Sequence, residues 1–299
     1  MIYDLIILGA GPAGITAAVY AARKRMSTLI ISKNVGGQTL LSSDIENYTG
    51  YQFITGAELV MKFREHLNQF DVELHEGEQV ELVNKEDIIR VKTNKDEYQA
   101  KTLVLATGRV PRKLQVEGED EYAGKGVTYC VTCDGPLFAG KDVAVIGGGN
   151  AALEAVLQMD KIAGRIYLVD IAPELRADPV MVEKAKQSEK VVIYNNASVE
   201  KIDGDRFVKR IKVKIDKKEE YLTVGGVFIE IGSVPAVGYI NDIKKNKSGE
   251  IFVNCQSQTS IPGIFAAGDV TDVYAKQIIV ACGEGAKAAL ASFEYLSKN

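Results

Sequence analysis

The sequence contains no tryptophan and has only two histidines, four cysteines and seven prolines among 299 residues. Cysteines at 130, 133, 255 and 282 are too few to staple a secreted scaffold of this length. A zinc site would need two further ligands beside a C-x-x-C pair, and His66 and His75 lie far upstream without ligand spacing. We therefore predict no resident metal.

Long apolar runs and an excess of positive charge are also absent. No stretch approaches the ~18 uninterrupted apolar residues of a membrane helix. Residues 1–8 run straight into an apolar strand, without the basic region and cleavage site of a signal peptide. The formal net charge of −4 gives no support to nucleic-acid binding. We expect a soluble, cytoplasmic protein that binds neither membrane nor nucleic acid.

A glycine-rich turn follows the first predicted strand. Residues 3–8 form an almost entirely apolar run, and Gly9, Gly11 and Gly14 complete a G-x-G-x-x-G motif before a helix rich in alanine. A second strand is predicted at 28–31. In this context the motif indicates a dinucleotide site, because glycines let backbone N–H groups approach a pyrophosphate at the start of a helix.

The same pattern returns 138 residues later in the chain. Residues 142–146 are predicted to form a strand, Gly147 to Ala152 form a G-x-G-x-x-A motif, and 165–169 are predicted to form the next strand. A further pair of similar segments, 103–111 and 227–235, lies near the ends of these units. The pattern predicts an α/β chain with two related Rossmann-like nucleotide-binding modules.

Short strands close both modules and are predicted at 80–83, 88–92, 98–99 and within 198–224. The tail adds predicted strands at 251–253 and 264–267 and a helix at 283–295. Because this is too little for a third domain, we expect the tail to fold back onto the first module, which is then discontinuous. The predicted division is 1–114 with 245–299 for the first domain and 115–244 for the second.

A C-x-x-C pair lies between the two glycine motifs. Cys130 and Cys133 have the spacing of a small, reducible disulfide. Asp134 follows directly, where its carboxyl group can move a proton to or from a thiolate. This order predicts electron flow from one cofactor through another into sulfur. Cys255 and Cys282 are expected to take no part.

These features together resemble the low-molecular-weight thioredoxin reductases and the flavoprotein half of the alkyl hydroperoxide reductase flavoprotein, over essentially the whole chain. Besides the motifs above, the resemblance rests on Gly36-Gly37-Gln38, Ile45-Glu46-Asn47-Tyr48, Ala106-Thr107-Gly108, Ala267-Gly268-Asp269 and Lys276-Gln277. It implies two-dinucleotide-binding flavoprotein architecture, with FAD in the first module and tail and a nicotinamide nucleotide in the middle module. It also implies a homodimer and a rotation that presents nicotinamide and dithiol to the flavin in turn.

The FAD site expected from the resemblance draws on several separate segments. Its residues are Gly9, Gly11, Pro12, Ala13, Gly14, Gly36, Gly37, Gln38, Asn47, Ala106, Thr107, Gly108, Gly268, Asp269, Lys276, Gln277 and Ile278. Asp269 is expected to bind a sugar or ribityl hydroxyl, with an ordinary helix N-cap as the alternative. The acidic residue that usually ends the second strand is missing, and Ser32 and Lys33 in that region are candidates to hold the adenosine.

The nicotinamide nucleotide is expected to bind in the second module. The expected residues are Gly147, Gly149, Asn150, Ala151, Ala152, Asp170 and Gly232. Asp170 lies where a carboxylate accepts hydrogen bonds from ribose hydroxyls and repels a 2′-phosphate. NADPH-using relatives carry His-Arg-Arg where this chain has Asp170, Ile171 and Ala172, and Arg176 alone makes a poor phosphate site. NADH is therefore the expected donor.

The expected reaction is a relay from NADH through FAD and the Cys130–Cys133 disulfide to a thioredoxin- or glutaredoxin-like protein. Thiol exchange of this kind passes through a mixed disulfide. By resemblance, Cys133 lies nearer the flavin and Asp134 is the acid or base. Because the chain starts at the flavin motif, the disulfide partner is expected to be a separate protein.

Three alternatives remain open. The donor could be ferredoxin or another non-nicotinamide reductant, or the protein could be a flavin-bound redox sensor without turnover. It could also be an oxidase that forms disulfides in small molecules and passes the electrons to oxygen. The intact turn Gly147–Ala152 and Asp170 argue against the first and the third. A sensor would show flavin reduction by NADH without turnover on any thioredoxin-like partner.

Overall fold

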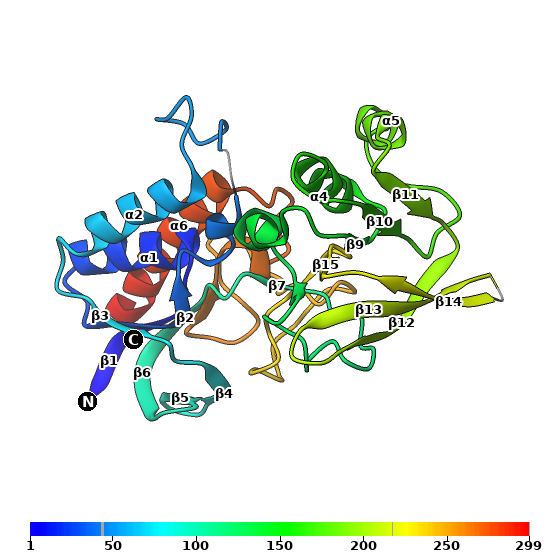
Figure 1. The fold of residues 1–299 in the computed structure, drawn as a ribbon. Coiled ribbons are helices and arrows are strands. Elements are labelled where there is room, and N and C mark those ends of the chain that lie inside the picture. Colours follow the sequence, from blue (N-terminus) through cyan, green and yellow to red (C-terminus); the bar gives the residue numbers. More distant parts are fainter. Residues whose placement is uncertain (43–44, 217, 299) are drawn as a thin grey trace. The chain divides into compact units, whose positions relative to one another are not determined.

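The computed structural model describes residues 1–42, 45–216 and 218–298. The chain divides into two compact units, in which unit 1 comprises Met1–Val110 with Val234–Asn299 and unit 2 comprises Pro111–Ser233. Unit 1 is therefore built from two separated segments of the chain (Figure 1). The two crossing segments, β7 (Arg109–Pro111) and β16 (Ser233–Pro235), pair with each other.

These division points differ from the ones predicted after residues 114 and 244. The second point lies earlier than predicted because Tyr239, Ile240 and Ile243 are buried in a hydrophobic cluster of unit 1. Their side chains join those of Leu8 and Ile31. The segment after β16 therefore belongs to the core of the first unit.

Unit 1 is organised around a sheet whose central strand is β1 (Ile2–Ala10). Its other strands are β2 (Thr28–Val35), β3 (Glu73–Glu76), β4 (Val80–Lys85), β5 (Ile89–Thr93), β6 (Glu97–Leu105) and β17 (Ile264–Ala266). β1 pairs in parallel with β2 and β6. The first half of β6 pairs with β5 and its second half with β17. The fully buried run Leu5–Leu8 fits a parallel strand covered on both faces.

The helices of unit 1 gather over one face of this sheet (Figure 1). They are α1 (Pro12–Arg23), α2 (Gly56–Leu67) and α6 (Ile278–Lys298). α1 presents Ala17 and Ala21, and α6 presents Ala288 and Ala289, to the same buried cluster. Small side chains let two helix backbones approach closely, so the end of the chain is packed onto its beginning. Successive side chains of a strand point to opposite faces of the sheet, so Ile6 and Leu8 pack on the face opposite these helices.

Unit 2 contains a second parallel sheet, in the order β11-β10-β9-β15-β8. Its strands are β8 (Val127–Thr128), β9 (Val143–Ile146), β10 (Ile166–Val169), β11 (Val191–Tyr194) and β15 (Gly226–Ile229). Helices α4 (Asn150–Asp160) and α5 (Pro179–Gln187) pack on one face. On the other face of the sheet, the core is formed with an antiparallel sheet. Its strands are β12 (Ala197–Gly204), β13 (Val208–Ile215) and β14 (Lys218–Thr223).

Most predicted elements are confirmed, including both strand–turn–helix units, the strands after residue 80 and the terminal helix. The strand predicted at 251–253 is wrong. Ile251 forms only isolated bridges, to Lys245 and Thr271, and Phe252 is 47% exposed. No neighbouring strand in the described chain runs beside this segment, so its apolar side chains anchor a loop.

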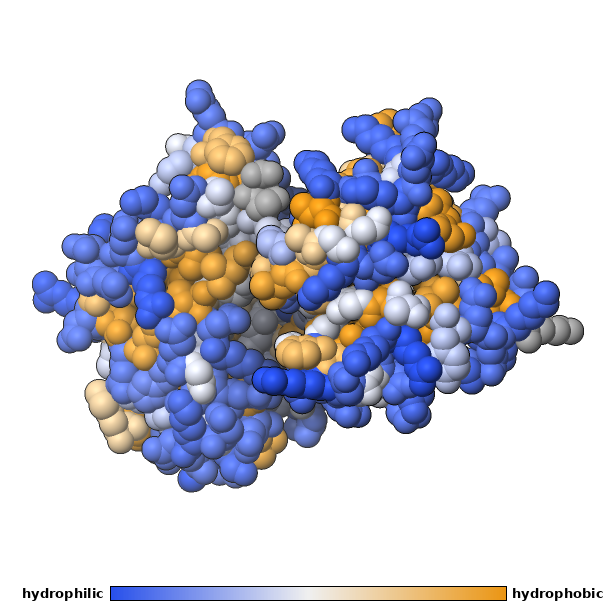
Figure 2. All heavy atoms as spheres, viewed as in Figure 1, coloured by the Kyte–Doolittle hydropathy of each residue, from blue (hydrophilic) through white to orange (hydrophobic). Residues whose placement is uncertain are grey.

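The surface seen in Figure 2 is largely hydrophilic, with smaller apolar groups between the charged residues. None of the helices in the described part of the chain combines the length and apolar character that a bilayer crossing requires. Within residues 1–42, 45–216 and 218–298, no group of three or more His, Cys, Asp or Glu side chains is placed to hold a metal ion.

Candidate functional site

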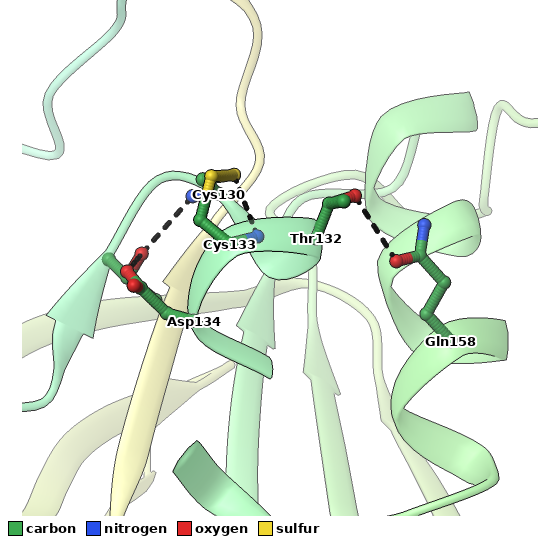
Figure 3. The surroundings of a disulfide bond; sticks show 6 residues. Cys130, Thr132, Cys133, Asp134 and Gln158 are labelled. Carbon is green, nitrogen blue, oxygen red and sulfur yellow. Dashed lines mark hydrogen bonds between the residues drawn. A yellow bond between two sulfur atoms is a disulfide. The ribbon is translucent and has the colours of Figure 1, made fainter. Parts of the chain in front are cut away.

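The paired cysteines of unit 2 form a disulfide bond. Cys130 and Cys133 are bonded, with a distance of 5.4 Å between their Cα atoms. Cys130 caps the short helix α3 (Val131–Asp134), and the N–H of Cys133 donates a hydrogen bond to the Cys130 Sγ at 3.1 Å (Figure 3). Cys130 is half-buried, whereas Cys133 is exposed. The pair is thus held ready for reduction in a compact turn, while Cys255 and Cys282 are free thiols.

The predicted acid or base, Asp134, lies directly beside this turn (Figure 3). Its backbone N–H donates to the Cys130 carbonyl at 3.1 Å. Its carboxylate accepts a hydrogen bond from the hydroxyl of Thr128. Sequence analysis identified Asp134 but missed Thr128, whose only sequence signal is its place at the end of a strand two residues before Cys130.

The glycine turn of unit 1 has the geometry of an anion site. α1 begins at Pro12 with Gly11 as N-cap, and no side chain caps its first N–H groups. A Cβ added to Gly11 would meet no described atom within 4 Å, so the space before the helix is open. A Cβ added to Gly14 would lie 1.8 Å from the Gly9 carbonyl oxygen, which requires glycine there. The helix N-terminus therefore fits a pyrophosphate.

The other residues expected to hold FAD come from the carboxyl ends of neighbouring strands in unit 1. Gly36 and Gly37 begin η1 (Gly37–Leu41) after β2, Ala106 to Gly108 follow β6, and Gly268 and Asp269 lie in η3 (Gly268–Val270) after β17. Lys276 to Ile278 lead into α6. The carboxyl ends of adjacent parallel strands meet at one sheet edge, so the fold brings these segments together.

Polar contacts link these segments within unit 1. The Gln38 side chain donates to the Arg109 carbonyl at 2.6 Å, and Asn47 donates to Gln277 Oε1 at 3.0 Å. The Thr107 hydroxyl donates to the Ala236 carbonyl at 2.7 Å. These predicted segments are therefore tied to other parts of the same unit.

A charged group that sequence analysis missed lies close to Asp269. Glu250 Oε1 is 2.9 Å from a guanidinium nitrogen of Arg109 and 3.2 Å from the Lys276 ammonium. Burial raises the pKa of Asp269, while the positive charges of Lys276 and Arg109 oppose that rise. The N-cap of η3 is Ala267, so Asp269 does not cap this turn.

At the end of β2, Ser32 is engaged by the protein itself. It is buried, its hydroxyl accepts the N–H of Ala10 at 3.1 Å, and it donates to the Asn34 carbonyl at 2.6 Å. Both hydrogen-bonding roles of the hydroxyl are thus used within the turn. This leaves Lys33, which is exposed, as the freer of the two candidates for the adenosine.

The corresponding position in unit 2 is different. Asp170 is 4% exposed, and among the described residues its Oδ2 atom has no hydrogen-bond partner. A Cβ on Gly148 would lie 2.1 Å from this oxygen, so glycine keeps the glycine turn and the carboxylate in close approach. Arg176 remains 3.8 Å from Oδ1. A buried carboxylate oxygen without a donor is costly, and the hydroxyl donors of a ribose would satisfy it.

The remaining predicted residues of unit 2 lie at the start of α4 and after β15. Gly149 is the N-cap of α4 without a side-chain cap, and Asn150 Oδ1 accepts the N–H of Asp178 at 2.8 Å. Ala151 is exposed on the first turn of α4, whereas Ala152 is fully buried. The carbonyl of Gly232 accepts the N–H of Arg112 at 2.9 Å.

Two further polar groups at this end of the unit 2 sheet were not foreseen. Asn195 follows β11, which pairs with β10 before Asp170, and its buried Oδ1 has no partner among the described residues. Glu230 follows β15. Burial, followed by the charge of Glu154, raises the pKa of Glu230 to about 7. Strand-end placement was the signal that could have identified both residues.

Known proteins resemble this chain over nearly its whole length. The family described as pyridine nucleotide-disulphide oxidoreductase matches residues 3–285. The chain is 38% identical over 302 residues to a Bacillus subtilis protein named NADH dehydrogenase. It is 39% identical over 302 residues to the F component of alkyl hydroperoxide reductase from Staphylococcus epidermidis strain RP62A. These alignments cover 99% of this chain but 59% and 60% of the two relatives, so the chain spans about three fifths of their length.

Solved structures that resemble the whole chain include thioredoxin reductases. The Lactococcus lactis enzyme, in its FR conformation, has a TM-score of 0.86 and 35% identity, covering 99% of this chain and 100% of that one. The T. acidophilum enzyme has a TM-score of 0.82 and 38% identity, covering 99% and 98%. A ferredoxin-flavin thioredoxin reductase of Clostridium acetobutylicum has a TM-score of 0.56 and 30% identity, covering 99% of both chains.

Proposed function

The chain belongs to the pyridine nucleotide-disulphide oxidoreductase family, and from this premise we propose that it is a thioredoxin-disulfide reductase that prefers NADH. It would pass two electrons from NADH through FAD and the Cys130–Cys133 disulfide to a thioredoxin- or glutaredoxin-like protein. Overall, NADH and one proton reduce the partner disulfide to a dithiol, with release of NAD⁺. The single observation that carries the proposal is a disulfide between Cys130 and Cys133 in a chain with two dinucleotide turns.

FAD held at the carboxyl edge of the unit 1 sheet would supply two-electron transfer between nicotinamide and sulfur. In this proposal Gly11 and Gly14 give the pyrophosphate access to the N-terminus of α1. Asp269 accepts a hydrogen bond from a sugar or ribityl hydroxyl. Gln277 and Ile278 at the start of α6 would help to hold the flavin, and Lys276 would supply a positive charge.

The dithiol would reduce its partner by thiol exchange. One thiolate of the pair attacks a sulfur of the partner disulfide and forms a mixed disulfide, and the second closes the Cys130–Cys133 bond and releases the reduced partner. Asp134 accepts the proton that the second thiol must lose before it can attack. Its place one residue after Cys133 supports this role.

The preference for NADH rests on Asp170. Its unpartnered Oδ2 offers an acceptor to ribose hydroxyls, and its negative charge would repel a 2′-phosphate. Two unit charges 4 Å apart repel each other by about 4 kcal/mol at the effective dielectric constant near a protein surface. The side chain of Arg176 is 68% exposed, so its positive charge would offset this repulsion only weakly.

We extend the proposal to a homodimer in the cytoplasm. The resemblance to thioredoxin reductases supports the dimer, and a reductase of disulfides suits a compartment that keeps thiols reduced. Analytical ultracentrifugation of the flavin-loaded protein would test the dimer directly.

The experiment that tests the proposed function is an anaerobic titration of the flavin-loaded protein with NADH and, separately, NADPH. Flavin absorbance is followed, and an oxidised thioredoxin-like protein is then added. We expect bleaching by NADH and reoxidation by the disulfide protein. The matched control is Cys130→Ser with Cys133→Ser, which should still bleach but should not turn over.

Other outcomes would reject specific parts of the proposal. If neither nucleotide bleaches the flavin, a ferredoxin-type donor or a dithiol oxidase would be favoured instead. Bleaching without turnover on any disulfide protein would support a redox sensor. Equal efficiency of NADPH would remove the role given to Asp170, and Asp170→Ala with arginines at 171 and 172 tests that role in the opposite direction.

A further inference from the structure

The side chain of Thr128 connects the backbone of Cys130 to the carboxylate of Asp134. Thr128 ends β8 and is 6% exposed. Its hydroxyl accepts the N–H of Cys130 at 3.2 Å and donates to Asp134 Oδ2. A hydroxyl has a single proton to donate. Because the backbone N–H uses its oxygen as an acceptor, the proton is directed at the carboxylate.

This arrangement is anchored on both sides. β8 pairs in parallel with β15, with Thr128 opposite Phe228, so the hydroxyl is carried by the edge of the parallel sheet. The N–H of Asp134 donates to the Cys130 carbonyl, which closes a ring of three hydrogen bonds around the first cysteine. Thr128 therefore sets the direction of the Asp134 carboxylate beside the disulfide.

We propose that Thr128 is a positioning residue that holds the Asp134 carboxylate oriented for the proton step of thiol exchange. The proposal deepens the proposed function and rests on it. In the step concerned, one cysteine is already joined to the partner as a mixed disulfide. The other thiol loses its proton to Asp134, attacks its neighbour and forms the Cys130–Cys133 bond. The mixed disulfide breaks, and the electron pair leaves with the partner sulfur as a thiolate that solvent protonates.

Two substitutions separate this role from a structural one. Thr128→Val keeps the branched shape that suits a strand and removes the hydroxyl. Thr128→Ser keeps the hydroxyl and removes the methyl group. A positioning role predicts that serine rescues the function and valine does not. A packing role predicts the reverse, because valine fills the buried space that serine leaves.

The measurement uses the full chain with Cys255→Ser and Cys282→Ala, so that only the paired cysteines react. The protein is reduced with dithiothreitol, desalted and mixed with the disulfide probe DTNB. The first thionitrobenzoate reports attack on the probe, and the second reports closure of the Cys130–Cys133 bond. In Thr128→Val we expect closure to slow about tenfold, a part of the 10²–10⁴-fold that general base catalysis supplies. Thr128→Ser should stay within about twofold of the parent, as rescue by a retained hydroxyl requires.

A double substitution completes the test. In an Asp134→Asn background, Thr128→Val should cause no further slowing of closure, because the two residues act through one carboxylate. An unchanged rate of closure in Thr128→Val, failure of Thr128→Ser to rescue closure, or full additivity with Asp134→Asn would overturn the proposal. The probe reaction does not need a nicotinamide nucleotide, so failure of NADH to bleach the flavin would reject the proposed function without deciding the role of Thr128.

Discussion

The two glycine turns of this chain share a motif but differ in how closely the following helix approaches. The third motif position is Gly14 in unit 1 and Ala152 in unit 2. A methyl group at Gly14 would lie 1.8 Å from the Gly9 carbonyl oxygen, whereas Ala152 carries one while fully buried. α1 is therefore seated closer to its turn than α4 is to the turn before it.

The ends of the second strands differ as well. Ser32 uses its hydroxyl to join Ala10 and Asn34, so unit 1 satisfies this position from within. Asp170 leaves a buried oxygen without a donor among the described residues, so unit 2 offers this position to a ligand. Under the proposed function both glycine turns receive a phosphate, and the comparison teaches that the residue at the strand end would decide whether the protein or the ligand supplies the remaining hydrogen bonds.

Exchange of the third motif residues should give the largest effect. Gly14→Ala places a methyl group against backbone that cannot move aside, and we expect a loss of about 3 kcal/mol or more in the free energy of unfolding. The reciprocal change, Ala152→Gly, should cost about 1 kcal/mol, the ordinary penalty of glycine in a helix. Urea unfolding of both variants measures the difference. Equal losses would mean that the two helices approach their turns alike.

Removal of the internal bond at Ser32 should come next. Ser32→Ala leaves the N–H of Ala10 buried without its acceptor, which costs about 1–3 kcal/mol. FAD affinity of the folded protein should change little, because the hydroxyl is already engaged. Unfolding and flavin retention should be measured on the same samples. A large loss of FAD with unchanged stability would show that Ser32 serves the ligand and would erase the contrast with Asp170.

The opposite result is expected at Asp170. Asp170→Asn should weaken NADH binding about tenfold, or ~1.4 kcal/mol, because the amide offers one acceptor where the carboxylate offers a charged pair. NADPH binding should stay the same or improve, because repulsion of the 2′-phosphate is removed. Calorimetric titration with each nucleotide measures both, and Ser32→Ala serves as the control that leaves NADH affinity unchanged. Parallel losses for the two nucleotides would contradict the assignment.

The smallest expected effect concerns the similar segments 103–111 and 227–235. At the same position of these segments, unit 1 has Ala106 and unit 2 has Glu230. Burial raises the pKa of Glu230 from 4.5 to about 7, so between these values the folded state binds more protons than the unfolded state. Stability should therefore fall as pH rises through this window and level off above it. Glu230→Gln should gain about 1 kcal/mol at pH 8, after allowance for partial exposure, and almost nothing at pH 5.

Unfolding in urea at the two pH values checks this difference. Glu154→Gln is the matched control, since it removes only the neighbouring charge and should give a smaller gain at pH 8 than Glu230→Gln. A gain that is the same at pH 5 and pH 8 would show that the carboxylate does not titrate in this window.

The sequence was sufficient for much of the fold, because its signals are local. Apolar runs that end in glycine turns identify β1, α1, β9 and α4, and the C-x-x-C spacing identifies the disulfide. The strand predicted at 251–253 was wrong because a short apolar run records burial and says nothing of a neighbouring strand.

The site residues that were missed depend on contacts between distant segments. Arg109 meets Glu250 across 141 positions of the chain. Thr128 reaches Asp134 only because α3 turns back toward the end of β8. Asn195 matters because its side chain is left without a partner among the described residues. Hydrogen bonds between side chains follow from tertiary placement, which residue types and spacing do not encode locally.

The split of unit 1 into two segments has a consequence for synthesis on the ribosome. When β1 and α1 emerge, their partners β17 and α6 are still untranslated, with the whole of unit 2 between them. At ~5–20 residues per second, the delay is on the order of 10–50 s. Unit 2, which is continuous, can fold in that interval, while the first segment of unit 1 waits with an uncovered apolar face. Exposed apolar surface of this kind favours aggregation, and a chain released before residue 264 would have one finished module.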